Sequence, residues 1–219
     1  MNISENIKNF QDELPKDVTL VAISKTKPVD DLLEAYEAGQ RHFGENKIQE
    51  MTEKWEKLPK DIKWHMVGHV QRNKVKYMAP YVSLIHAVDS LKLLKEINKE
   101  ADKNGHCINC LLQIKIAEED SKFGISADEA KQILDSEEFK KLDHVKVKGL
   151  MGMATFTDDE AQVKKEFDHL KSVFKDFKEQ YSNFEILSMG MSGDYKIAIK
   201  SGSNMVRIGS SIFGARNYS

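Results

Sequence analysis

A lysine at the end of a short apolar run is the first residue whose position suggests chemistry. Lys25 follows the run LVAIS at 20–24 and precedes Thr26, Lys27 and Pro28. If the run is a buried strand, the lysine stem leaves an apolar wall, and partial desolvation lowers the pKa of its amine. Such an amine can form a Schiff base with a carbonyl compound. A solvated lysine at a strand end is the alternative, and Lys27 competes within the same loop.

Two loops near the carboxyl end of the chain combine glycine with serine. They are SMGMSGD at 188–194 and RIGSS at 207–211. Glycine lets the backbone approach a ligand closely, and Ser192 lies at an expected helix start, where free backbone N–H groups bind anions. The pair of loops therefore predicts a phosphate site, with two capped tight turns as the alternative.

Arg207 stands within an apolar strand pattern near the second of these loops. It alternates with Val206 and Ile208, so its side chain faces away from both of theirs. A buried arginine needs a partner, because an uncompensated charge is costly to remove from water. A ligand heteroatom or a carboxylate across the sheet would serve.

The two cysteines, Cys107 and Cys110, form a spacing that superficially resembles a redox or zinc half-site. On a strand, residues three apart lie about 10 Å apart on opposite faces, beyond disulfide reach. A second cysteine pair is absent, and His65 and His69 have no evident third partner, so we expect no metal site.

Short β-rich runs alternate with helical patterns along the chain and must position these residues. Helix caps support the pattern, since Ser90 and Ser126 precede helices and Gly39 and Gly105 follow them. Eight strands with seven intervening helices predict a closed (β/α)8 TIM barrel with an extra N-terminal helix at 3–14, and an open doubly wound sheet is the alternative. The predicted strands are 19–25, 41–45, 63–68, 83–89, 108–116, 144–153, 184–191 and 204–214, and the predicted helices are 29–38, 47–58, 73–79, 91–104, 127–134, 158–181 and 194–199.

Composition indicates one domain over residues 1–219, with 40% hydrophobic and 31% charged residues. A chain of this length buries enough surface to fold without disulfides or a structural metal. The 33 basic and 35 acidic residues are interspersed, which gives no footprint for nucleic-acid binding. No window approaches the roughly 20 apolar residues of a membrane helix, and the amino terminus is too polar for a signal peptide. We expect a cytoplasmic protein without nucleic-acid or membrane partners.

The order and spacing of the motifs resemble the pyridoxal phosphate homeostasis protein family of the YggS/PROSC type. This family shares its barrel with the amino-terminal domain of alanine racemase. The resemblance runs from about residue 18 to residue 218 and covers nearly the whole chain. The motifs that carry it are AISKTKP at 22–28, AGQRHFGENKIQE at 38–50, WHMVGHVQRNK at 64–74, SKFGI at 121–125, KGLMGM at 148–153 and LSMGMSGDYKIAIKSGSNMVRIGSSIFGARNYS at 187–219.

The resemblance implies that the cofactor is pyridoxal 5'-phosphate (PLP), held as a Schiff base on Lys25. Arg207 would face the pyridine nitrogen, and because arginine keeps its proton, the ring would be a weaker electron sink than one paired with an aspartate. Ser192 and the Gly209–Ser210 backbone and hydroxyl would hold the phosphate, and Asn46 would lie beside the ring. The cofactor-binding residues implied are thus Lys25, Asn46, Ser192, Arg207, Gly209 and Ser210.

The resemblance further implies a monomeric, non-enzymatic protein of intracellular vitamin B6 and amino-acid homeostasis, with no catalytic residues. Its partners would be PLP itself and PLP-dependent apoenzymes. Lys27 or Lys122 could hold a second PLP, and His69, where relatives often have Pro or Gly, could alter access to the barrel mouth.

A racemase-like PLP enzyme of the same barrel is the alternative function. It needs proton donors on both faces of the substrate, and only Lys25 is evident, with Tyr195 and Tyr218 as the nearest phenols. Only five residues follow Gly214, too few for the additional domain of the racemases. A barrel that acts on a phosphorylated sugar or heterocycle without PLP is a third candidate.

Overall fold

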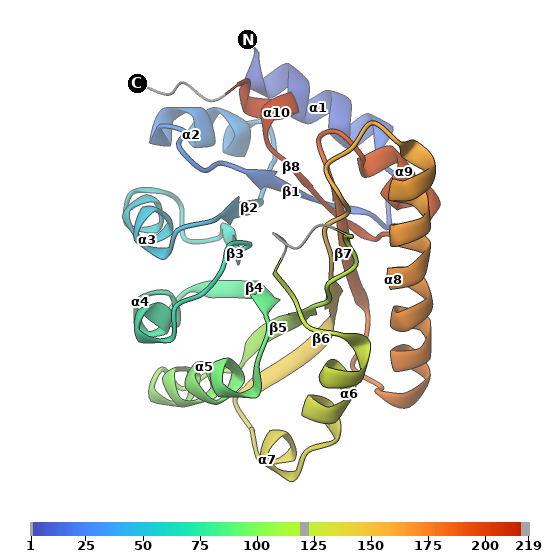
Figure 1. Cartoon of the computed structure of the whole chain (residues 1–219). Helices are drawn as coiled ribbons and strands as arrows, with labels where there is room; N and C mark the ends of the chain where they lie inside the picture. Colours follow the sequence, from blue (N-terminus) through green and yellow to red (C-terminus); the bar gives the residue numbers. More distant parts are fainter. Residues whose placement is uncertain (1, 119–122, 216–219) are drawn as a thin grey trace.

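Eight parallel strands pair in chain order, and β8 (Met205–Ile208) pairs with β1 (Thr19–Ile23), so the sheet closes into a barrel (Figure 1). The structure is a computed structural model that describes residues 2–118 and 123–215. The predicted TIM barrel is confirmed, and the open sheet is wrong. The other strands are β2 (His42–Glu45), β3 (Lys63–Met66), β4 (Val82–Val88), β5 (Ile108–Gln113), β6 (Val145–Met151) and β7 (Ile186–Met191).

Apolar side chains form one layer outside the barrel and a second layer inside it. The outer layer joins the sheet to the helices and buries Phe43, Trp64 and Phe167 completely. The inner layer is smaller and includes Val21, Leu111 and other side chains that point into the barrel. Because parallel strands are buried on both faces, their sequences read as continuous apolar runs, which is why the sequence revealed all eight.

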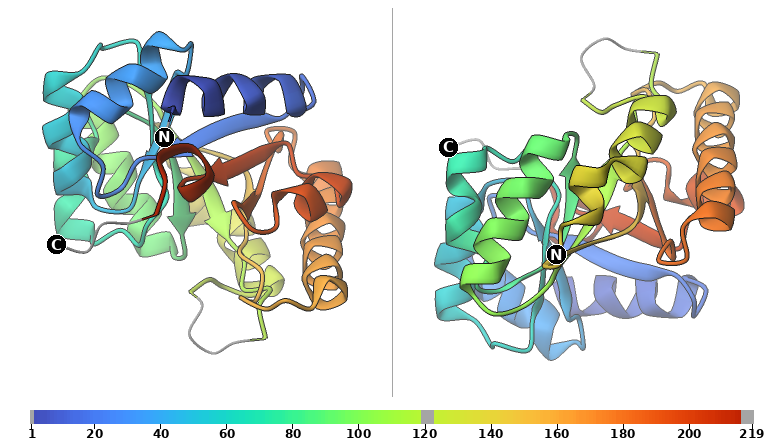
Figure 2. Two further views of the ribbon diagram at one scale, coloured as in Figure 1. Left: turned by 90° about the horizontal axis from the view of Figure 1, so that it is seen from above. Right: turned by 90° about the horizontal axis from the view of Figure 1, so that it is seen from below.

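Helices surround the strands on the outside of the barrel (Figures 1 and 2). Ser90 and Ser126 accept hydrogen bonds from backbone N–H groups of the helices they precede, as predicted. No described helix is both long enough and apolar enough to cross a membrane. The helices are α1 (Ile3–Glu13), α2 (Val29–Glu37), α3 (Ile48–Lys57), the 3-10 helix η1 (Arg72–Lys74), α4 (Val75–Met78), α5 (Leu91–Lys103), α6 (Ala127–Asp135), α7 (Glu137–Lys140), α8 (Glu160–Gln180), α9 (Tyr195–Lys200) and α10 (Ser210–Phe213).

The carboxyl-terminal part of the chain departs from the prediction. The strand expected over 204–214 ends at Ile208, because Gly209 leaves the extended conformation and its carbonyl accepts hydrogen bonds from Ile212 and Phe213. Residues 210–213 therefore form α10. The short helix α7 was not predicted either, and it begins where the Ser136 hydroxyl accepts a hydrogen bond from the Phe139 N–H.

Helix α1 packs between α2 and α9 in the outer ring of helices. Its Ser4 N–H donates to Glu34 of α2, and its Phe10 ring meets the Tyr195 ring of α9 edge to face with 5.6 Å between centroids. The Asn6 side chain also donates to the Ile212 carbonyl of α10. The first and last helices of the described chain thus lie against each other (Figure 1).

Candidate functional site

A cavity of about 680 Å³ opens at the end of the barrel where the strands lead into the following loops. Barrel enzymes carry their sites at this carboxyl face. The structure brings all the predicted cofactor-binding residues together there, while their roles toward a ligand stay predictions. The lining residues include Lys25, Asn46, Ser192, Arg207, Gly209 and Ser210.

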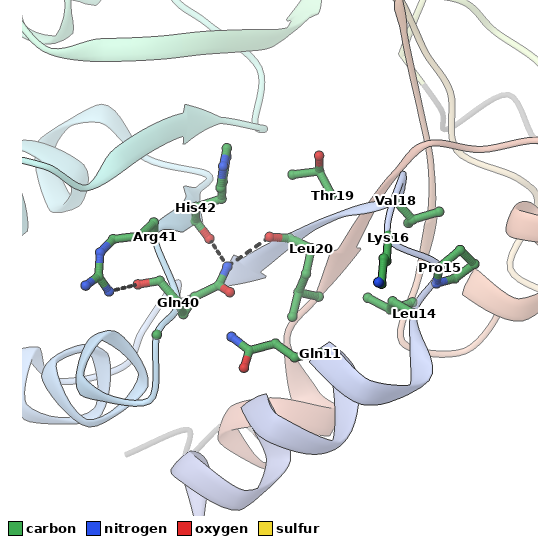
Figure 3. Close-up of a pocket in the computed structure, with 11 residues that line it drawn as sticks. Gln11, Leu14, Pro15, Lys16, Val18, Thr19, Leu20, Gln40, Arg41 and His42 are labelled. Carbon is green, nitrogen blue, oxygen red and sulfur yellow. Dashed lines mark hydrogen bonds between the residues drawn. The ribbon is translucent and has the colours of Figure 1, made fainter.

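A second, smaller cavity of about 320 Å³ lies near the opposite end of the barrel, between α1 and the starts of β1 and β2 (Figure 3). Its polar groups are used to hold the fold. The Gln40 amide donates to the carbonyls of Leu20 and His42, which ties β1 to β2. Arg41 donates to the Gln40 carbonyl and forms an ion pair with Asp61. None of the predicted site residues lines this second cavity.

The loop after β1 separates its two lysines. Both lysines line the main cavity, and Lys25 is half-buried. Thr26 has a φ of 63°, and it is the only residue other than glycine with a positive φ in the described ranges. The Lys27 amine donates to the carbonyls of Phe213 and Ala215 at 2.7 and 3.0 Å, so it is held at the end of α10. Lys122 lies outside the described residues.

A buried ion pair lies beneath this loop, and sequence reasoning missed it. The Lys54 amine donates to Glu45 Oε1 and to the Ser24 carbonyl, both at 2.7 Å. Ser24 Oγ donates to the same Glu45 oxygen at 2.6 Å. Burial raises the pKa of Glu45 to about 6, against the opposing effect of the Lys54 ammonium. The available signal was the spacing of Lys54 with Ile48 and Met51, which places a charge on the apolar face of α3.

Glu50 connects the ion pair to the turn that contains Thr26. Glu50 Oε1 accepts hydrogen bonds from the Lys54 amine at 2.7 Å and from the Thr26 N–H at 2.6 Å. The backbone on both sides of Lys25 is therefore fixed from below by one cluster of charges.

The two glycine and serine loops meet at the other side of the cavity. Ser192 Oγ accepts a hydrogen bond from the Gly209 N–H at 3.2 Å, which joins the loops after β7 and β8. A Cβ atom at Gly209 would lie 3.2 Å from the Ile23 carbonyl oxygen, so glycine permits this close approach. Ser210 begins α10 and is exposed.

Ser192 does not stand at a helix start, contrary to the prediction. Helix α9 begins at Tyr195 and its N-cap residue is Asp194. The Asp194 carboxylate accepts a hydrogen bond from the Met191 N–H, which stabilises the tight turn that contains Ser192. The Ser192 hydroxyl is consequently aimed at the neighbouring loop and does not cap α9.

Arg207 is almost completely buried, with 4% of its surface exposed, and it lines the cavity. Its Nη1 donates to Ser188 Oγ at 2.6 Å and its Nη2 to the Gly152 carbonyl at 3.1 Å. No salt bridge among the described residues includes Arg207, but the charge of the nearby Asp194 carboxylate opposes the effect of burial on its pKa. Burial lowers the pKa of Arg207 to about 10, which leaves it protonated at neutral pH.

Asn46 lies directly after β2 and faces Gly68, which follows β3. A Cβ atom at Gly68 would lie 2.3 Å from the Asn46 carbonyl oxygen, so only glycine allows these two backbones to come so close. Both residues line the cavity. Their contact sets the position of Asn46 at the mouth of the barrel.

Aromatic and apolar side chains complete the cavity wall. The His69 ring stacks on Phe123 with 5.3 Å between centroids, and both line the cavity, so His69 lies at the mouth as predicted. No tyrosine lines the cavity within the described ranges. Tyr195 donates from its hydroxyl to Glu13 in the outer ring of helices, and Tyr218 lies outside the described residues.

The cysteine and histidine pairs considered from the sequence do not meet at this site. Cys107 is exposed and Cys110 is buried in the wall of the barrel, and the two thiols are free. Burial raises the pKa of the Cys110 thiol. His65 is buried inside the barrel, whereas His69 is largely exposed and lies 3.7 Å from Asp89.

Comparison with known proteins agrees with this geometry. Residues 1–217 match the model of the alanine racemase N-terminal domain family. The pyridoxal phosphate homeostasis protein of Haemophilus influenzae is 37% identical over 100% of this chain and 98% of its own length. That of Escherichia coli is 33% identical, also over 100% of this chain and 98% of its own.

Solved structures show the same fold. PipY of Synechococcus elongatus, solved with PLP bound, has a TM-score of 0.88 and 31% identity over 97% of this chain and 100% of that one. The alanine racemase of Clostridium difficile has a TM-score of 0.80 at 17% identity, with 57% of its chain covered, and shows likeness of fold alone. On these matches, the chain belongs to the pyridoxal phosphate homeostasis protein family.

Proposed function

We propose that this protein binds PLP reversibly through a Schiff base to Lys25 and serves PLP homeostasis without turning over a substrate. The observation that carries the proposal is one cavity lined by Lys25, by the buried Arg207 and by the two glycine and serine loops, with Lys27 also in the lining but held by backbone carbonyls. Relatives across the full chain are named for PLP homeostasis, and a neighbour matched over 97% of this chain was solved with PLP bound.

The chemistry of the cavity fits the three polar parts of PLP. An aldehyde requires an amine, which Lys25 supplies. A pyridine nitrogen requires a hydrogen-bond donor, and Arg207 is a buried cation with three N–H groups beyond the two that Ser188 and Gly152 accept. When bound, PLP supplies an electron-withdrawing ring, whose strength depends on protonation of its nitrogen. Because Arg207 donates a hydrogen bond but keeps its proton, this site favours holding the ring over activating it.

The phosphate would lie between the two loops. Ser192 Oγ accepts the Gly209 N–H, so the hydroxyl proton of Ser192 is available to donate to a phosphate oxygen. The Ser210 hydroxyl adds a second donor at the start of α10. Hydrogen bonds to a charged group are stronger than those between neutral groups, which makes these few donors effective.

The lack of a tyrosine among the described residues that line the cavity supports a carrier over a racemase. Racemisation by two bases needs a donor on each face of the substrate. The described residues that line the cavity include no tyrosine, and the hydroxyl of Tyr195 is engaged by Glu13 on the outside of the barrel.

The test is the visible absorption spectrum of the protein with PLP, followed by borohydride reduction and peptide mapping. We expect a yellow, reducible adduct on Lys25 that disappears in Lys25→Ala and persists in Lys27→Ala. An adduct on Lys27 would show that the anchor is wrong. A colourless protein without an adduct would reject PLP and favour the barrel that acts on a phosphorylated substrate.

A second measurement separates the carrier from an enzyme. The PLP-loaded protein is mixed with alanine enantiomers, and in parallel with a PLP-dependent apoenzyme. We expect recovery of apoenzyme activity without racemisation above the rate of free PLP. Racemisation at enzyme-like turnover, abolished in Lys25→Ala, would contradict the proposal.

A further inference from the structure

Three histidines from neighbouring strands form a line of hydrogen bonds through the inside of the barrel. His42 Nδ1 lies 2.9 Å from His65 Nε2, and His65 Nδ1 lies 2.9 Å from His86 Nε2. His86 Nδ1 lies 3.0 Å from Ser188 Oγ, which in turn accepts from Arg207 at 2.6 Å. The line starts at Arg207, which lines the main cavity, and ends at His42, the first residue of β2, which lines the second cavity near the opposite end of the barrel.

The arginine fixes the direction of the hydrogen bonds in this line. Arginine can only donate, so Ser188 Oγ accepts from Arg207. Ser188 is fully buried, and its other hydrogen-bond partner is His86, so its hydroxyl proton is satisfied only by donation to His86 Nδ1. His86 then carries its own proton on Nε2 and donates to His65 Nδ1, and His65 donates in the same way to His42.

The reverse direction leaves a buried group without a partner. If His86 donated from Nδ1, Ser188 would accept two hydrogen bonds and its own proton would have no acceptor among the described residues. A buried hydroxyl donor without an acceptor is destabilising, because nothing replaces the hydrogen bond to water that it loses on folding. The arrangement with every proton on Nε2 satisfies each link of the line.

The three rings are held neutral, as a one-way line requires. A protonated imidazole donates from both nitrogens and could not accept from its neighbour. Burial lowers the pKa of His42 to about 4, of His65 to about 3, and of His86 well below its ordinary value. The charges of Lys63 near His42 and His65, and of Arg207 near His86, act in the same direction.

We propose that Ser188, His86, His65 and His42 form a one-way relay of hydrogen bonds, with each histidine protonated on Nε2, that positions Arg207 in the cavity. These are positioning residues, because they act through the guanidinium and not on a ligand. The relay leaves Ser188 as a fixed acceptor, so Arg207 keeps one orientation and directs its remaining N–H groups toward the cavity. The consequence for PLP rests on the proposed function, whereas the relay itself is a property of the free protein.

Nuclear magnetic resonance of the free, 15N-labelled protein tests the relay directly. Scalar couplings between nitrogens across a hydrogen bond identify the donor and the acceptor of each N–H···N contact. The chain has seven histidines, and His42→Gln, His65→Gln and His86→Gln assign the three signals. We expect protons on Nε2 of His86 and His65, with Nδ1 of His65 and His42 as acceptors. A proton on Nδ1 of any of the three, or exchange between the two tautomers, would overturn the relay.

Variants of Ser188 test the positioning of Arg207. Ser188→Ala removes the acceptor of Arg207, and we expect several-fold weaker PLP binding and a shifted absorption maximum of bound PLP. Ser188→Thr keeps the hydroxyl and should restore both. His169→Gln, at an exposed histidine on α8, is the matched control. A folded Ser188→Ala protein with unchanged affinity and spectrum would overturn the positioning role.

His86→Phe provides a second variant in case Ser188→Ala does not fold. It keeps a ring in place but accepts no proton from Ser188, so we expect the same direction of change in affinity and spectrum. Wild-type values in a folded His86→Phe protein would overturn the proposal as well. If the unmodified protein bound no PLP, the proposed function would fail, and the nitrogen couplings would still decide the relay.

Discussion

At the residue scale, Lys25 depends on a buried ion pair that the sequence does not reveal. Lys54 holds the Ser24 carbonyl just before Lys25, and Glu45 holds Lys54. The second oxygen of Glu45, Oε2, has no hydrogen-bond partner among the described residues. A buried carboxylate that relies on one cation is strongly destabilised when that cation is removed.

Lys54→Met should therefore lower the free energy of unfolding by about 3–5 kcal/mol, because it leaves Glu45 buried without its partner. Urea denaturation followed by circular dichroism measures the loss. The double variant Lys54→Met with Glu45→Gln should recover much of it, since the uncompensated charge is gone. Lys57→Met, at an exposed lysine of the same helix, is the control, and an equal loss there would contradict this account.

Ser192→Ala tests the loop contact that would face the phosphate. The variant loses one donor to a charged group and the acceptor of the Gly209 N–H. We expect PLP to bind roughly 10-fold more weakly, since a hydrogen bond to a charged group contributes about 1.5–3 kcal/mol. Fluorescence titration with PLP gives the dissociation constant. Ser211→Ala, exposed and outside the lining of the cavity, should bind as the parent does, and equal affinities of the two variants would reject the phosphate role of Ser192.

At the element scale, the sequence predicted every strand of the barrel but not how β8 ends. Apolar runs identify buried strands reliably, because both faces of a parallel sheet are covered. Gly209, by contrast, turns the chain through contacts with α10 that no local pattern encodes. Secondary structure near a glycine is set by what the glycine approaches, here the Ile23 carbonyl of β1.

The same distinction applies to the candidate site. The location of Lys25 and Arg207 at the cavity could be predicted, because Lys25 directly follows an apolar strand pattern and Arg207 interrupts one. The histidine line could not, since its members come from β2, β3 and β4 and align only when the barrel closes. Strand periodicity predicts whether a side chain points into or out of the barrel. It does not predict which side chains meet inside the barrel, and the hydrogen bonds of this line depend on that.

Helix α1 yields a prediction about the contact between the first and last parts of the chain, where α1 packs on α9. Phe10 is buried against Tyr195, so Phe10→Ala should lower the free energy of unfolding by about 3–5 kcal/mol. We also expect faster hydrogen exchange of amides in α9, which loses its neighbour. Gln11→Ala removes an exposed side chain of the same helix and should change neither quantity. Unchanged exchange in α9 with Phe10→Ala would show that α1 does not stabilise it.

At the scale of the whole molecule, the neutral histidines make stability depend on pH. Folding lowers the pKa of His65 from 6.5 to about 3 and of His42 to about 4. Below pH 6.5 the unfolded chain binds protons that the folded chain does not, so stability falls as the pH falls. Glu45 has the opposite effect on stability. Because its pKa is raised to about 6 in the folded chain, the folded chain binds this proton at a higher pH than the unfolded chain does, which stabilises the folded chain as the pH falls.

The free energy of unfolding should consequently decrease between pH 6.5 and about pH 5, with each buried histidine contributing roughly 1.4 kcal/mol per pH unit. Urea denaturation at a series of pH values measures the slope. His65→Gln removes one titrating group and should flatten it, whereas His169→Gln, at an exposed histidine, should not. A slope that is unchanged in His65→Gln would contradict the assignment of a neutral buried ring.

The pairing of the first and last strands has a consequence for protein synthesis. Val21 of β1 lies in register with Arg207 of β8, so the loop of Lys25 meets its partners only after the last strand has left the ribosome. A nascent chain that ends before β8 has the lysine but neither the arginine nor the loop of Gly209. If Lys25 and Arg207 hold PLP as proposed, capture of the cofactor would thus require that β8 has been synthesised, and shorter translation products would leave PLP unbound.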